Sequence, residues 1–119
     1  MTVKEYNEMI SKLKDATDLR MLSWEKKDGN NDSSFSSTVG KCRLDINSYY
    51  DNMIDDDTYS LCLYNEKGEV FRILNYSPSN NNSQFVELPN LYASVRDSYY
   101  HITESEKNIM DTLNSMIPF

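Results

Sequence analysis

The chain has 119 residues, of which 39% are hydrophobic and 12% aromatic, and its formal charge at pH 7 is -7. This length fits one domain with its own core, and the apolar content argues against wholesale disorder. No apolar run approaches the roughly 20 residues that a membrane-spanning helix needs. The acidic balance, without clustered Lys and Arg, disfavours nucleic-acid binding. We therefore expect residues 1–119 to form a single domain that contacts neither a membrane nor nucleic acid.

The N-terminal segment predicts a helix. Thr2 and Glu5 fit a capping box, in which each side chain accepts a hydrogen bond from the other residue's backbone N–H. Apolar residues then recur at helical spacing, at Val3, Tyr6, Met9, Ile10 and Leu13. We expect this helix to end near Thr17. Because a helix start occupies the place of a signal peptide, we expect a cytoplasmic location.

A meander of four antiparallel strands is predicted next, at 20–26, 35–47, 59–64 and 69–74. The first strand carries Leu22 and Trp24 on one face, and the second alternates apolar and polar residues with a period of two. Gly40 predicts a bulge or bend within the second strand. The segments 28–34 and 49–58 read as loops, because one is rich in Asp, Asn, Gly and Ser and the other is acidic.

The segment 65–68 predicts the turn of a hairpin, with Gly68 at a left-handed position. Such a turn fixes a register. One face, the predicted core face, pairs Leu63 with Phe71 and Leu61 with Ile73; the outer face pairs Tyr64 with Val70 and Cys62 with Arg72. Cys42 alternates onto the inward face and Cys62 onto the outward one. We therefore expect both cysteines to be free thiols.

The C-terminal part predicts helical structure over 88–117. Leu88, Leu91, Tyr92, Val95 and Tyr99 recur at helical spacing, and Pro89 suits a first turn. A second capping box, at 103–106, precedes another periodic run. The alternatives are two helices that bend near His101 or one long helix, and the capping box favours two. The predicted fold is α+β: an N-terminal helix, a four-stranded antiparallel meander, and one or two C-terminal helices.

No motif predicts catalysis, a metal site or a cofactor. Asp28, Asn30 and Asp32 begin like a calcium loop, but Ser33 and Val39 occupy the positions that require Gly and Glu. The aspartates at 51 and 55–57 read as a solvated charge run. The single histidine has no partner nucleophile in the sequence, and the three glycines are too isolated for a phosphate loop. We therefore expect a protein that is not an enzyme and needs no metal or cofactor.

Binding is the remaining class of function. Arg72 and Arg96 can hold a carboxylate or phosphate through two hydrogen bonds, although a surface arginine without a ligand is the commoner case. Aromatic residues can stack on a ligand. The candidate binding residues are Trp24, Tyr64, Arg72, Arg96, Tyr99 and His101. Whether the helices leave the outer sheet face open is a question that the sequence does not answer.

The order of these elements resembles small uncharacterised α+β domains of bacteria and phages. The residues that carry the resemblance are Trp24, the turn 65–70, and Leu91, Tyr92, Val95 and Arg96. The resemblance implies an α+β fold and no activity, site or cofactor.

Two functional hypotheses follow. The first is a non-enzymatic binding or protein-interaction module of bacterial or phage origin, such as an immunity or anti-defence factor, with a protein partner or a second copy of the chain as its target. The second is a binding protein for a small, nucleotide-like molecule.

Overall fold

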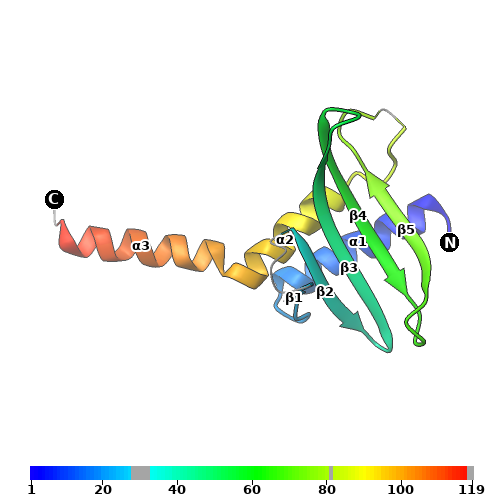
Figure 1. Cartoon of the computed structure of the whole chain (residues 1–119). Coiled ribbons are helices and arrows are strands. Elements are labelled where there is room, and N and C mark those ends of the chain that lie inside the picture. Colours follow the sequence, from blue (N-terminus) through cyan, green and yellow to red (C-terminus); the bar gives the residue numbers. More distant parts are fainter. Residues whose placement is uncertain (28–32, 81, 118–119) are drawn as a thin grey trace.

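The computed structural model describes residues 1–27, 33–80 and 82–117 and shows an α+β fold (Figure 1). One N-terminal helix precedes a five-stranded antiparallel sheet and two C-terminal helices. In chain order the elements are α1 (Val3–Asp18), β1 (Glu25–Lys26), β2 (Ser34–Val39), β3 (Cys42–Asp51), β4 (Asp56–Tyr64), β5 (Val70–Tyr76), α2 (Leu88–Tyr100) and α3 (Ile102–Met116). The predicted fold class is confirmed, with five strands in place of four.

The start of α1 follows from its local sequence. The backbone N–H of Thr2 donates to Glu5 Oε1, and the N–H of Glu5 donates to Thr2 Oγ1, each at 3.1 Å. The predicted capping box is therefore confirmed. The buried residues of α1 include Tyr6, Ile10 and Leu13, as the apolar stripe predicted.

The end of α1 explains why most of the predicted strand 20–26 does not form. Arg20 adopts a left-handed conformation with φ +60°, and the N–H of Met21 donates to the carbonyl of Ala16 at 2.9 Å. This pair of features closes a helix C-terminus and turns the chain away from it. Only Glu25 and Lys26 then pair with β2.

The predicted strand 35–47 is divided into β2 and β3. Val39 pairs with Cys42, so Gly40 and Lys41 form a two-residue hairpin loop, and Gly40 has φ +62°. Glycine accepts a positive φ at this position without the steric cost that a Cβ brings. Gly40 is thus a hairpin turn rather than a bulge or bend, and it produces the fifth strand.

The strands β3 and β4 also extend into the predicted loop 49–58. Their ladder continues through Tyr49 with Thr58 as far as Asp51 with Asp56. Tyr and Thr favour strands, whereas our prediction gave more weight to the aspartates. The other predicted loop, 28–34, lies largely outside the described residues, as does the calcium-like pattern at 28–32.

The turn between β4 and β5 forms as predicted. The N–H of Asn65 donates to the carbonyl of Glu69 at 2.9 Å, and Gly68 has φ +80°. Tyr64 pairs with Val70, in agreement with the predicted register. Beyond that pair a β-bulge follows, since Leu63 pairs with Arg72 and Phe71 is the additional residue.

The bulge overturns the predicted register of β5. A shift of one residue moves every following side chain to the other face of a sheet. Leu74 therefore points to the core and is 2% exposed, whereas Ile73, predicted to be internal, is 53% exposed. Phe71 is likewise half exposed. The prediction for Cys62 is confirmed, because it lies opposite Asp45 of β3 on the outer face. Both cysteines are free thiols, as predicted.

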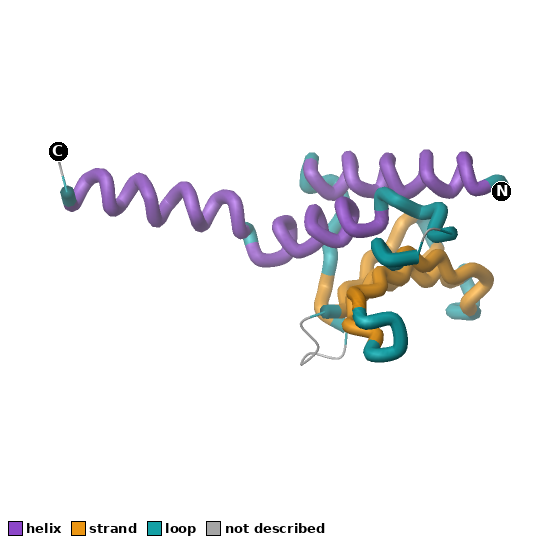
Figure 2. The backbone as a smooth tube through the Cα atoms, turned by 90° about the horizontal axis from the view of Figure 1, so that it is seen from above, coloured by secondary structure: helices purple, strands orange, loops and turns teal. Residues whose placement is uncertain are grey.

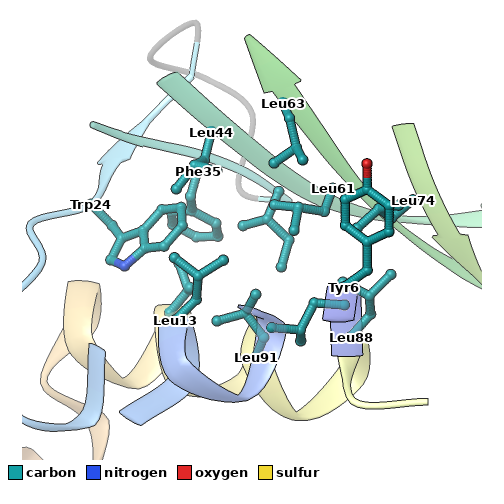
Figure 3. Packing of buried hydrophobic residues seen from close by; sticks show 13 residues of the cluster. Tyr6, Leu13, Trp24, Phe35, Leu44, Leu61, Leu63, Leu74, Leu88 and Leu91 are labelled. Carbon is teal, nitrogen blue, oxygen red and sulfur yellow. The ribbon is translucent and has the colours of Figure 1, made fainter. Parts of the chain in front are cut away.

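The helices α1 and α2 lie on the same face of the sheet. Figure 2 shows α1 and α2 side by side above the strands, with no helix on the opposite face. The core fills the space between the two layers (Figure 3) and includes Tyr6, Ile10, Leu13, Trp24, Phe35, Leu44, Ile46, Leu61, Leu63, Leu74, Leu88, Leu91 and Val95. The sheet therefore has an outer face that none of the described helices covers.

The C-terminal segment forms two helices. His101 has φ +53°, which ends α2 and starts α3 in a new direction, so that α3 projects away from the sheet (Figure 1). The predicted second capping box is wrong. The backbone N–H and the hydroxyl of Thr103 both donate to Asp97 Oδ1 at 2.8 Å, so Thr103 is bound to α2 instead.

Two neighbouring substitutions test the bulge. We expect Leu74→Ala to lower the free energy of unfolding by about 2–5 kcal/mol, because it leaves a cavity in the core. Ile73→Ala should cost less than about 1 kcal/mol, because this side chain faces solvent. Urea denaturation followed by Trp24 fluorescence measures both. A larger loss of unfolding free energy for Ile73→Ala than for Leu74→Ala would contradict the bulge and support the predicted register.

Candidate functional site

Trp24, a candidate for ligand stacking, lies in the core. Its side chain is nearly buried, and its indole Nε1–H donates to Thr17 Oγ1 at 3.1 Å. The Thr17 hydroxyl in turn donates to the carbonyl of Leu13 at 2.7 Å. This chain of hydrogen bonds satisfies a polar group that the packing would otherwise leave unpaired. Trp24 thus joins β1 to α1.

Arg72 projects to the helix side of the sheet, not to the predicted outer face. The bulge at Phe71 is the reason, because it places Arg72 opposite Leu63. The Nε–H of Arg72 donates to the Tyr6 hydroxyl at 3.0 Å, and its guanidinium lies 5.8 Å from the centre of the Tyr6 ring. Arg72 therefore ties β5 to α1.

Three further candidates lie at the C-terminal end of α2. The guanidinium of Arg96 stacks 5.6 Å from the ring centre of Tyr100. Tyr99 and His101 line a hollow of about 390 Å³ together with Trp24. Arg20, which also lines this hollow, is already paired with the carboxylates of α2 and α3. The charge available there for an anionic ligand is therefore small.

The pairing of Arg20 fixes the junction between α2 and α3. Its Nη2 lies 3.3 Å from Asp97 Oδ2 and 3.4 Å from Glu104 Oε1. His101 Nδ1 lies 3.3 Å from Glu104 Oε2. The hydrogen bonds of Asp97 with Thr103 and its contact with Arg20 lower the pKa of the Asp97 carboxyl. These contacts join the end of α1 to the base of α3.

Tyr64 is the one candidate that lies on the outer sheet face. The guanidinium of Arg43 sits 3.9 Å from the centre of its ring. Asp45, two residues beyond Arg43 on β3, points to the same face, and its side chain is only 3% exposed. Lys27 Nζ lies 3.0 Å from Asp45 Oδ2, and Arg43 Nε lies 3.3 Å from Asp45 Oδ1. Two cations therefore cover this carboxylate.

The charge state of Asp45 follows from these contacts. Burial raises the pKa of the Asp45 carboxyl, whereas hydrogen bonds with Ser36, Lys27 and Tyr64 lower it by more, and the balance lies below the ordinary value. The carboxylate form is thus favoured in the folded protein.

A polar row crosses the outer face beside Asp45. Ser34, Asn47, Ser60 and Asn75 stand opposite one another on four strands. Ser60 Oγ donates to Asn75 Oδ1 at 2.5 Å. Asn47 Oδ1 is buried and has no hydrogen-bond partner within the described ranges. The middle of the outer face is therefore polar and closely packed.

The apolar part of this face lies along β5, at one edge of the sheet. We define the β5 surface as Tyr64, Val70 and Ile73, which lie on this face, together with the bulge residue Phe71. Val70 is 48% exposed, and Phe71 and Ile73 are each 53% exposed. The sheet order ends at β5, so no described strand pairs with its second edge. The sequence analysis did not predict that Phe71 and Ile73 are exposed, because the alternation of residues alone placed them on the core face.

The six candidates therefore do not form one site. Trp24, Tyr99 and His101 share a hollow, Arg96 stacks on Tyr100, and Arg72 and Tyr64 lie on opposite sides of the sheet. Within residues 1–27, 33–80 and 82–117, no three His, Cys, Asp or Glu side chains are grouped so that they could hold a metal ion. None of the helices in the described part of the chain is long and apolar enough to cross a membrane.

Comparisons with protein-family models, with curated proteins and with solved structures found no match to this chain.

The paired carboxylate of Asp45 predicts a pH dependence of stability. Since its pKa is lower in the folded than in the unfolded state, its contribution is present above the unfolded value, about 3.9, and is lost as the pH falls through the folded value. We expect Asp45→Asn to cost about 1–3 kcal/mol at pH 7 and progressively less below pH 4. Urea denaturation across this pH range measures the difference.

The matched control is Asp57→Asn, which changes an exposed carboxylate on β4. It should stay within about 0.5 kcal/mol of the native chain. An Asp45→Asn cost that does not change with pH would show that the carboxylate charge contributes nothing.

Proposed function

We propose that this chain is a protein-interaction module that binds an extended segment of a partner protein along β5. The observation that carries the proposal is an edge strand with half-exposed Val70 and Ile73 on a sheet face that none of the described helices covers, and with the half-exposed bulge residue Phe71 beside them. Edge strands present unpaired N–H and C=O groups, and partner segments bind by adding a strand to such an edge.

The usual protections against strand addition are few on β5. It has seven residues, and neither Pro nor Lys nor any acidic residue stands among them. Its one charged side chain, Arg72, is held by Tyr6 on the helix side. The bulge at Phe71 bends only the start of the strand. Ile73 to Tyr76 therefore remains a regular edge.

The chemistry of the β5 surface defines the partner segment. A strand that pairs with β5 places alternate side chains over Val70 and Ile73, so those side chains should be apolar. The chain carries a formal charge of -7, which attracts basic segments and speeds their association. We therefore propose a partner segment that alternates apolar residues with Lys or Arg. Masking such a segment is compatible with an immunity or anti-defence role in bacteria or phages.

Binding of a nucleotide-like molecule has less support. Such a ligand requires an arginine and stacking aromatic rings at one place. Arg72 and Tyr64 project from opposite faces, Trp24 is buried, and Arg20 is paired with two carboxylates. Arg96 does lie beside an aromatic ring, but the ring on which it stacks is that of Tyr100 in its own helix.

Selection from a random peptide display library tests strand addition without knowledge of the natural partner. We expect the enriched peptides to alternate apolar and basic residues and to shift the amide resonances of β5 in NMR spectra. Ile73→Lys should weaken peptide binding at least tenfold, which is about 1.4 kcal/mol, because it places a cation where an apolar side chain must pack. Fluorescence anisotropy with a selected peptide measures the affinity.

Val86→Lys is the matched control, because Val86 is equally exposed but lies outside the sheet. It should leave peptide affinity unchanged. Peptides that shift resonances elsewhere, or an equal loss of affinity in both variants, would contradict binding along β5. A thermal-shift screen with nucleotides that stabilises the chain would favour the small-ligand hypothesis instead.

A further inference from the structure

The helix α3 is exposed along almost its whole length, from Thr103 to Met116. None of its residues is buried, and among the described elements it packs mainly against α2 (Figures 1 and 2). Its direction is nevertheless fixed at its base, by the hydrogen bonds of Thr103 with Asp97 and by the contacts of Arg20 and His101 with Glu104. The chain therefore holds a helix in solvent through specific contacts.

Such a helix gains little stability from its own sequence. It has 15 residues, about 22 Å in length, and isolated helices of about 12–15 residues are marginal in water even when they are rich in alanine. This segment contains no alanine, and it includes Thr, Asn, Ser and β-branched Ile, which are weaker helix formers. Packing against another surface would supply the missing stability.

One side of α3 is apolar. Ile102, Ile109, Leu113 and Met116 recur at spacings of seven, four and three residues, which place them in one stripe. Ile109 is 59% exposed and Met116 is 70% exposed. A hollow of about 270 Å³ lies in the middle of this stripe, lined by Asn108, Ile109, Thr112 and Leu113. An apolar side chain from outside the molecule can fill it.

We propose that two copies of the chain associate through antiparallel pairing of their α3 helices. In the heptad that the stripe defines, Ile102, Ile109 and Met116 occupy d positions and Leu113 an a position. The positions that flank this seam carry no charge: Thr103, Ser105, Met110 and Thr112. The charges of Glu104, Lys107 and Asp111 lie on the far side of the helix. Apart from Glu106, no charged residue stands in or beside this seam, so two acidic copies can bring their stripes together with few like charges facing each other.

Glu106 decides the orientation of the two helices. It occupies the remaining a position of the seam. A parallel pair would place Glu106 directly against Glu106 of the second copy, which is unfavourable for two carboxylates. In an antiparallel pair, Ile109 of each copy packs against Leu113 of the other in the two central layers. Glu106 then lies beside Met116 of the second copy, at the end of the contact. There its carboxylate reaches water.

A lipid surface fits α3 less well than a second copy does. Helices that lie on anionic membranes carry Lys and Arg on their polar face. The charged residues of α3 are three acids, Glu104, Glu106 and Asp111, and one base, Lys107. The acids would oppose adsorption to anionic lipid.

The contact is small, so the dimer should be reversible. Two helices of this length bury less than the roughly 1,200 Å² of a standard stable interface. Sedimentation velocity of the full chain between about 10 and about 500 μM should therefore show a shift from monomer to dimer, with a Kd in the micromolar range. Helix content measured by circular dichroism should rise with concentration in parallel.

Leu113→Glu should weaken dimerisation at least tenfold, because it places two carboxylates in the central layers. Asn114→Glu, which adds the same charge one residue further on the outward face, should leave the dimer intact. Because α3 contributes nothing to the core, both variants should keep the native near-ultraviolet signal of the buried Trp24. Peptide binding to β5 should also be unaffected, which separates this proposal from the proposed function.

A mixture of Glu106→Lys and native chains tests the orientation. The antiparallel alignment predicts no preference for the mixed dimer, whereas parallel helices would bring the lysine against Glu106 and favour it. A native chain that stays monomeric at about 500 μM would overturn the proposal, since a micromolar dimer is largely assembled there. Equal effects of Leu113→Glu and Asn114→Glu would overturn it too, as would adsorption to vesicles of anionic phospholipid without dimerisation.

Discussion

The bulge at Phe71 determines how β5 serves two purposes at once. One additional residue turns Arg72 toward α1 and Leu74 into the core, and it leaves Ile73 on the open face. Arg72 then holds Tyr6, and Leu74 packs in the layer that α1 and α2 cover. The same shift gives the edge strand its apolar outer side. The attachment of the sheet to α1 and the character of its free edge therefore have one cause.

The parts of the fold that the sequence predicted are those that local interactions determine. The capping box at Thr2 and Glu5 and the apolar spacing of α1 involve residues at most four positions apart. The turn at Gly68 likewise depends on one residue's conformational freedom. The sequence indicated an irregularity at Gly40. It did not indicate a hairpin there, because the alternation of apolar and polar residues continues on both sides of the turn.

The errors arose where contacts between distant residues decide the structure. No local sequence pattern indicates the bulge. The apolar residues Phe71 and Ile73 alternate with Arg72, as they would in a strand whose apolar side faces the core. The capping motif at 103–106 was lost because Asp97, one helix earlier, binds Thr103. Of the candidate binding residues, Trp24 and Arg72 are large polar–apolar side chains that the fold uses to join its layers. The residue types of Trp24 and Arg72 alone could not distinguish this structural role from ligand binding.

Within the part of the chain that the structure describes, two residues other than glycine adopt left-handed conformations at the ends of helices. Arg20 and His101 each bear a cost of about 1–2 kcal/mol for this backbone. Both side chains contact Glu104, and Arg20 also contacts Asp97. These contacts favour the conformation that sets the angle at which α3 leaves the domain. The geometry of this corner is therefore maintained by Arg20, which follows α1, and by the carboxylates of Asp97 in α2 and Glu104 in α3.

The order of the strands has a consequence for the way the chain acquires its structure. Every strand pairs with its neighbour in sequence, so the sheet can assemble by successive short-range hairpins without long loops to close. The packing of α1 on α2 is different, because it joins the beginning of the chain to residues beyond 88. During synthesis on the ribosome, the apolar side of the sheet and the stripe of α1 must therefore wait for α2 to emerge before the core can close. Until then, this small acidic chain exposes both to its surroundings.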